Sequence, residues 1–159
     1  MKIKPQLTIT ISVCIVLTGI AFTYILGLWT TQTTKVPKKL EQSEYSDQYD
    51  PSDIRGSYTF SEISNLFNIP VEDLAAAFLV DENIAAEFKC SELEKIYTDT
   101  PNEIGTGSVR MFVAFYLGFP YELTEDTYLT DSAAQILKQK SSITPEQLTY
   151  LETHITIVS

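Results

Sequence analysis

The feature that most constrains this chain is an apolar segment near its N-terminus. Residues 5–34 carry no formal charge, and the apolar centre runs over 23 residues from Leu7 to Trp29. The hydrocarbon core of a bilayer is about 30 Å thick, and at about 1.5 Å per residue a helix needs roughly 20 apolar residues to cross it. The sequence therefore predicts a single transmembrane helix over residues 7–29, preceded by a short tail of residues 1–6.

A cleaved signal peptide shares this layout and is the alternative to an anchor. Signal peptides have an apolar core of about 7–15 residues, followed by small residues at the cleavage site. Here the apolar run is longer, and Trp29 is followed by Thr-Thr-Gln-Thr-Thr, without an Ala-x-Ala pattern. These features favour an uncleaved anchor.

Small residues recur along the predicted span. Gly19, Thr23 and Gly27 are spaced four positions apart, so they would share one face of a helix. Small side chains let a second helix approach closely, which gives packing energy where lipid offers no hydrophobic drive. Small residues are also common in spans, so chance is an equal alternative. If the stripe is functional, its partner is another transmembrane helix.

Charge divides sharply along the chain. Residues 1–40 carry five Lys and no acid, whereas residues 41–159 carry six Lys or Arg against 21 Asp or Glu, a net charge of −15. The acidic part is repelled by nucleic acid and by anionic lipid, which argues against nucleic-acid binding. Basic residues flank both ends of the span, so they do not fix its orientation. Because a short tail is easily retained, we expect a cytoplasmic N-terminus and a domain on the extracytoplasmic face of the cell membrane.

The rest of the chain divides into a linker and a domain. Residues 30–56 are polar and acidic, which predicts a linker that holds the domain off the membrane. From Ser57 onward apolar residues recur at helical spacing, so we expect residues 57–159 to form a small all-α soluble domain. Cys14 lies in the predicted span and cannot pair with Cys90, so this domain must be held by core packing rather than by a disulfide.

Helix starts are marked by capping boxes, in which a Ser or Thr and a Glu or Gln three positions later satisfy free backbone amides. They occur at residues 59–62, 91–94 and 144–147. The second box opens a short helix that is expected to turn Leu93, Ile96 and Tyr97 inward. Further helices are expected from residue 70 or 71 to 78, over 109–117 as the central core element, from an Asp131 cap through 138, and from 145 to near 154. Residues 155–158 alternate loosely like a strand without an evident partner.

The first two expected helices, between Thr59 and Phe78, have the layout of a helix-turn-helix. A DNA-reading second helix would carry basic or amide side chains toward the bases and phosphates. Here that helix reads PVEDLAAAF, with two acids and no Lys or Arg. The pair is therefore interpreted as a unit for packing or for protein recognition.

Three segments of the domain carry a family resemblance: DIRGSYTFSEISNLFNIPVEDLAAAFLVDENI, CSELEKIY and SVRMFVAFYLGFP. Together they resemble the small helical soluble module at the C-terminus of prokaryotic cytochrome-b-like and polyferredoxin-like membrane electron-transfer proteins, over about residues 53–120. Asn68 stands where that module has Gly, residues 79–81 replace its Leu-Pro loop, and its redox membrane portion is missing. The resemblance implies a helical accessory module near respiratory machinery and supplies no catalytic residue.

Recognisable reaction chemistry is not found in the sequence. It has no Cys-x-x-Cys-His, no cysteine cluster, no Gly-rich phosphate loop and a single imidazole, His154, which is better explained as a helix-end residue. Asp47, Asp50 and Asp53 do not have the spacing of a calcium loop and lack its glycine. We therefore predict no catalytic residue, no metal site, no cofactor and no small-molecule substrate.

The leading hypothesis is a membrane-anchored, non-catalytic accessory subunit that sits in the bilayer and binds other membrane protein subunits. The alternative is a structural subunit of a membrane redox complex, cytochrome or iron-sulfur, without a cofactor of its own. An absorbance spectrum of the purified complex would separate the two, because only the second predicts visible-region bands.

Overall fold

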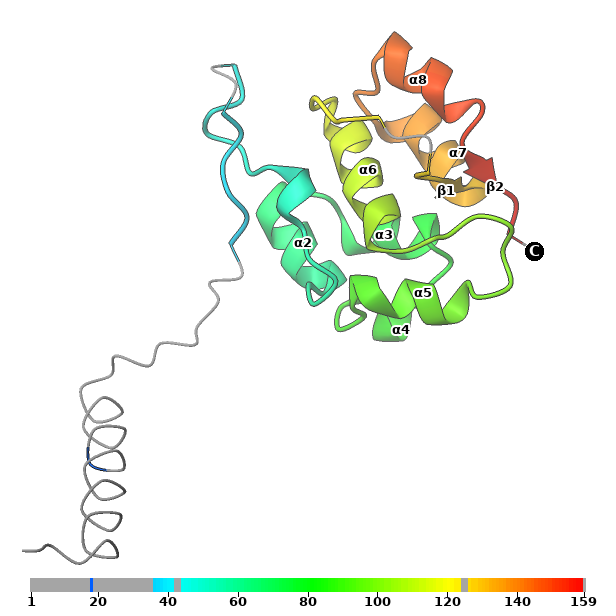
Figure 1. Cartoon of the computed structure of the whole chain (residues 1–159), viewed down its shortest axis with the longest axis horizontal. Coiled ribbons are helices and arrows are strands. Elements are labelled where there is room, and N and C mark those ends of the chain that lie inside the picture. Colours follow the sequence, from blue (N-terminus) through cyan, green and yellow to red (C-terminus); the bar gives the residue numbers. More distant parts are fainter. Residues whose placement is uncertain (1–17, 19–35, 42–43, 124–125, 159) are drawn as a thin grey trace, which may run out of the picture. The chain divides into compact units, whose positions relative to one another are not determined.

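The computed structural model describes Thr18 and residues 36–41, 44–123 and 126–158 (Figure 1). The chain divides into two compact units, Met1–Thr34 and Lys35–Ser159. The expected transmembrane segment, with Gly19, Thr23 and Gly27, lies outside the described residues apart from Thr18. Among the residues that are described, no helix is both long enough and apolar enough to cross a bilayer.

The second unit is mostly helical, as expected. Its described elements, in chain order, are η1 (Pro51–Asp53), α2 (Phe60–Phe67), α3 (Val71–Ala77), α4 (Glu82–Ala85), η2 (Cys90–Glu92), α5 (Leu93–Ile96), α6 (Thr106–Leu117), β1 (Leu129–Thr130), α7 (Asp131–Lys140), α8 (Pro145–Leu151) and β2 (Ile155–Thr156). The helical fold class is thus confirmed, with one pair of two-residue strands added to it.

Two of the expected capping boxes are confirmed. Thr59 accepts from the Glu62 amide at 3.2 Å while the Glu62 carboxylate accepts from the Thr59 amide at 2.9 Å, which starts α2. Thr144 and Gln147 make the same reciprocal pair at the start of α8, where Pro145 occupies the first helical position. That helix ends at Leu151, three residues before the predicted end at His154.

The capping box predicted at Ser91 and Glu94 is wrong by two residues. The Glu92 carboxylate accepts from the Lys89 amide at 2.8 Å, so the turn starts at Lys89 and opens with η2 before α5. Lys89 also forms an isolated antiparallel bridge with Thr59, which holds its backbone extended and so fixes the start there. The predicted Asp131 cap is likewise wrong, because the Thr130 hydroxyl accepts from the Ala133 amide at 3.0 Å and caps α7.

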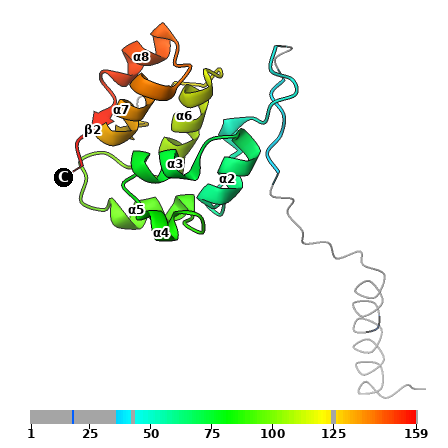
Figure 2. The same ribbon diagram turned by 180° about the vertical axis from the view of Figure 1, so that it is seen from behind.

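The core is built around α6, as the helical spacing of its apolar residues predicts. Val109 and the five residues 111–115 of this helix are fully buried. In both views α6 lies between α2 on one side and α7 with α8 on the other (Figures 1 and 2). Aromatic rings continue the packing across elements, with Phe60 against Phe78 at 6.1 Å and Phe78 against Phe112 at 5.7 Å between centroids.

A buried carboxylate ties three helices together. Asp73 in the first turn of α3 is only 5% exposed and accepts from the Tyr116 hydroxyl of α6 at 2.8 Å. It also pairs with the Lys140 ammonium at the end of α7, at 2.5 Å. Burial, and then the hydrogen bond to Asp73, raises the pKa of Tyr116 to about 12. This carboxylate therefore serves the fold, since both its partners come from neighbouring helices.

The folded unit extends further toward the N-terminus than the expected boundary at Ser57. Ile54 is fully buried, and its carbonyl oxygen accepts from the Arg110 Nε of α6 at 2.7 Å. Tyr49 packs against Phe67 with ring centroids 6.4 Å apart. Residues 49–56 are thus part of the packed domain rather than of a free linker.

The strand predicted near the C-terminus has a partner. β2 pairs in parallel with β1, with Leu129 opposite Ile155 and Thr130 opposite Thr156. Parallel strands need a crossover connection, and α7 and α8 supply it here. The pairing brings the last described residues back against the middle of the domain.

Candidate interaction groove

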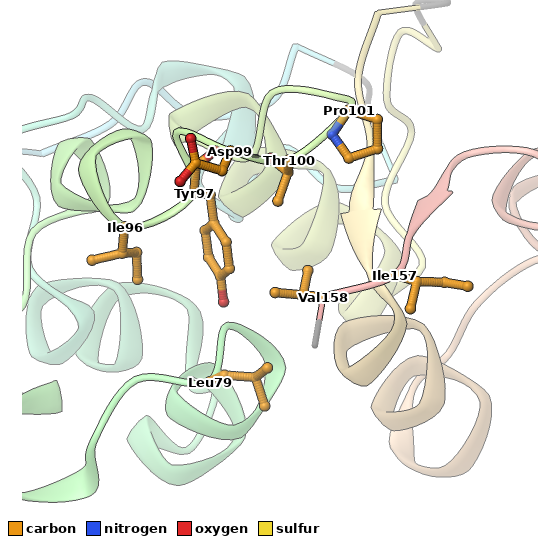
Figure 3. A pocket seen from close by; sticks show the side chains of 8 residues that line it. All are labelled: Leu79, Ile96, Tyr97, Asp99, Thr100, Pro101, Ile157 and Val158. Carbon is orange, nitrogen blue, oxygen red and sulfur yellow. Dashed lines mark hydrogen bonds between the residues drawn. The ribbon is translucent and has the colours of Figure 1, made fainter.

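An open groove of about 450 Å³ lies where three distant parts of the chain meet (Figure 3). It is formed by the turn after α3, by the end of α5 with the loop that follows, and by the residues after β2. Its lining residues are Leu79, Ile96, Tyr97, Asp99, Thr100, Pro101, Ile157 and Val158. Most of these side chains are apolar, and in Figure 3 those of Leu79, Ile96, Tyr97, Thr100 and Val158 surround a common space, whereas Ile157 extends away from it beside Val158.

Hydrogen bonds hold the three parts of the groove in place. The Tyr97 hydroxyl donates to the Phe78 carbonyl oxygen at 2.6 Å, which links α5 to the end of α3. The Asn102 amide nitrogen lies 3.1 Å from the Thr156 hydroxyl, which links the loop to β2. Because these bonds join segments far apart in sequence, the floor of the groove is set by the complete fold.

Tyr97 forms part of the floor and keeps its proton. Burial, and to a lesser degree the nearby negative charge of Asp131, raises the pKa of the Tyr97 phenol above its usual value. The side chain therefore acts as a hydrogen-bond donor throughout the neutral range. It anchors the groove instead of presenting a reactive group to it.

Leu79 occupies a strained backbone position at the end of α3. The Val80 amide donates to the Ala75 carbonyl oxygen at 2.9 Å and the Leu79 amide donates to the Ala76 carbonyl oxygen at 3.5 Å. This is the Schellman pattern, whose penultimate residue takes the left-handed conformation and is usually Gly. Leu79 adopts it with φ +49°, although a branched side chain is disfavoured there.

Other helices of the same domain end in a left-handed residue of the usual type. α6 ends at Gly118, with φ +69°, and α2 ends at Asn68, with φ +53°. Gly has no Cβ, and Asn is the side chain that tolerates this conformation best. Among the described residues of the domain Leu79 is therefore the exception, and strain of this kind is typically kept where a side chain serves a function.

Exposed apolar side chains concentrate at this groove. Five large hydrophobic residues of the described chain are exposed, and three of them line it: Leu79 at 53%, Ile96 at 52% and Ile157 at 80%. Exposed apolar residues gathered in one place mark interaction sites more often than single scattered ones do. The groove is thus the best candidate for a functional surface on the described part of the domain.

The sequence predicted little of this site. The expected partner-packing residues, Gly19, Thr23 and Gly27, lie outside the described residues. Ile96 was expected to face inward, which is wrong: α5 is only one turn long, and Leu93 and Tyr97 at its ends take the inward positions. Leu79 was not singled out, because its left-handed backbone at the helix end is visible only in the structure.

The reactive side chains of the domain are engaged in packing. His154 stacks on Tyr150 with ring centroids 3.7 Å apart, and its Nδ1 lies 2.9 Å from the Tyr150 carbonyl oxygen. Cys90 is fully buried, and burial raises the pKa of its thiol to about 12, so it stays protonated and unreactive. In the part of the chain that the structure describes, no three His, Cys, Asp or Glu residues are grouped as metal ligands would be.

Comparisons with protein-family models, with curated proteins and with solved structures found no match to this chain. The resemblance to the helical module of membrane electron-transfer proteins therefore stays a prediction from the sequence. The functional proposal below is based on the geometry of the groove.

Proposed function

We propose that this chain is a membrane-anchored, non-catalytic accessory subunit that binds partner proteins through the groove. The observation that carries this proposal is Leu79, which combines a strained backbone with a side chain that is 53% exposed at the groove. An exposed apolar side chain on an unfavourable backbone conformation is best explained by a contact with another molecule. Ile96 and Ile157 extend the same apolar surface.

The predicted span from Leu7 to Trp29 supplies the anchor in this proposal. It restricts the domain to one membrane and makes other membrane protein subunits the available partners. Gly19, Thr23 and Gly27 would provide a second contact, to a helix within the bilayer. The proposed orientation has a cytoplasmic N-terminus and the acidic domain on the extracytoplasmic face.

Co-purification in mild detergent tests the role of the groove. The full chain is compared with Leu79→Gly, which removes the side chain where glycine fits the backbone, and with Ile84→Ser as the matched control. Ile84 is 56% exposed but does not line the groove. We expect the Leu79 variant to remain folded and lose its partner, whereas the Ile84 variant keeps it. Equal recovery of the partner with both variants would refute the proposal.

The stripe within the predicted span is tested separately. Gly19→Leu and Gly27→Leu place bulk where a partner helix would approach, and should reduce recovery of the complex while the domain stays folded. Normal assembly of both variants would show that the stripe is not a contact site, and would leave the proposed role of the groove standing.

A further inference from the structure

We propose that the occupant of the groove is a short segment of a partner protein that inserts apolar side chains and carries Lys or Arg beside them. This inference rests on the proposed function and adds the chemistry of the partner to it. The apolar side chains of this segment are inferred from the exposed apolar residues of the groove. The Lys or Arg residues of the segment are inferred from the negative charges at and near the groove.

One acidic side chain lines the groove, and further carboxylates lie near its lining residues along the chain. Asp99 is the only charged residue among the eight that line it. Asp81 lies two positions after the lining residue Leu79, and Lys95 lies one position before Ile96. Glu103 lines a different pocket, and the Glu94 side chain packs against Gly105, so neither is counted as a charge of the groove. A backbone hydrogen bond from Asn83 lowers the pKa of the Asp81 carboxyl, so this charge persists in mildly acidic solution.

A further carboxylate lies next to the last segment of the groove. Asp131 accepts from the amide of Val158 at 3.4 Å, and its charge acts on the Tyr97 phenol. The field of the whole domain has the same sign, since residues 41–159 carry a net charge of −15. A basic segment is therefore attracted to the groove and an acidic one is repelled, with the largest effect on the rate of association.

A small molecule fits this surface less well than a protein segment does. Pockets for small ligands enclose about 70–90% of the ligand surface. Here Leu79, Ile96 and Ile157 are each more than half exposed, so a small ligand resting on them would remain largely in water. A longer chain segment can cover more of this open surface than a small molecule can.

A second copy of this chain is also disfavoured. Two-fold association brings the same patch of both subunits together. The acidic surface around Asp99 would then lie against a second acidic surface, because the domain carries a net charge of −15. Charge thus favours a different protein over self-association.

The test is a selection of random 12-residue peptides displayed on phage against the full chain in detergent micelles. We expect the enriched peptides to combine large apolar residues with Lys or Arg. A selected peptide, made synthetically and labelled, should bind Leu79→Gly about tenfold more weakly, because about half of a leucine side chain is lost from the contact. Binding to Asp99→Lys should fall about fivefold and should show less salt dependence.

Glu122→Lys makes the same change of net charge at an exposed residue that does not line the groove, and should leave binding within twofold of the original. Enriched peptides that depend on Leu79 but lack basic residues, and bind Asp99→Lys normally, would overturn this inference and leave the proposed function standing. Absence of any peptide that depends on Leu79 would overturn both. A concentration-dependent dimer that Leu79→Gly abolishes would identify a second copy as the occupant and overturn the inference.

Discussion

The left-handed backbone at Leu79 predicts an inverted order of stability for two substitutions. Leu79→Ala and Leu79→Gly both remove the exposed side chain, but only alanine keeps a Cβ in the disfavoured conformation. A left-handed L-residue costs about 1–2 kcal/mol, whereas glycine costs about 0.5–1 kcal/mol through the freedom it gains in the unfolded chain. The glycine variant should therefore be the more stable of the two by about 0.5–1 kcal/mol.

Ala76, one turn earlier in α3, provides the matched control. It is exposed and helical, as the penultimate residue of α3. There Ala76→Gly should follow the ordinary rule and lower the free energy of unfolding by about 1 kcal/mol. The same chemical difference, alanine against glycine, should thus have opposite signs at two positions three residues apart.

Urea unfolding of the full chain in detergent micelles, followed by far-ultraviolet circular dichroism, measures both differences. With an m-value of about 2 kcal/mol per molar, the expected gap between the two Leu79 variants corresponds to about 0.3–0.5 M in the unfolding midpoint. A Leu79→Ala variant as stable as Leu79→Gly, or more stable, would show that Leu79 is not held at positive φ. Backbone strain at Leu79 would then no longer indicate a function for its side chain.

Three further outcomes follow from Gly118, Tyr116 and Cys90. Gly118→Ala should destabilise the domain by more than about 2 kcal/mol in urea unfolding, because a Cβ there would meet the Ser142 carbonyl oxygen at 2.6 Å and the φ of +69° disfavours alanine. Folding raises the pKa of Tyr116 from about 10 to about 12, so its contribution to stability should be complete below pH 10 and be lost between pH 10 and 12; Tyr116→Phe should flatten that part of the stability profile. In a variant whose other cysteine is replaced by serine, Cys90 should react with a maleimide only after urea is added, and rapid reaction of the native chain would contradict its burial.

Local interactions explain which parts of the fold could be predicted from the sequence. A capping threonine such as Thr59 or Thr144 acts on amides two or three residues away, so its effect is visible in a short window. The same holds for the helix stop at Gly118. The start near Ser91 was misplaced because Lys89 is not a capping residue by type; the Glu92 carboxylate accepts from its amide, and the bridge to Thr59, distant in sequence, holds Lys89 extended there.

The groove could not be predicted, because it depends on contacts between distant segments. Its parts meet through the pairing of β1 with β2 and through the bond from Tyr97 to Phe78. A two-residue strand such as β2 gives almost no periodic signal of its own. The left-handed backbone of Leu79 is likewise seen only in the structure, which also shows the residues that lie beside it.

A surface assembled from such distant segments exists only while the whole domain is intact. An occupant would bind the native chain and not the unfolded one, so it would shift the unfolding equilibrium in favour of the native chain in proportion to its concentration. A chain without a bound partner would unfold more often and be degraded sooner. Binding of a partner in the groove would then control the amount of this protein in the cell.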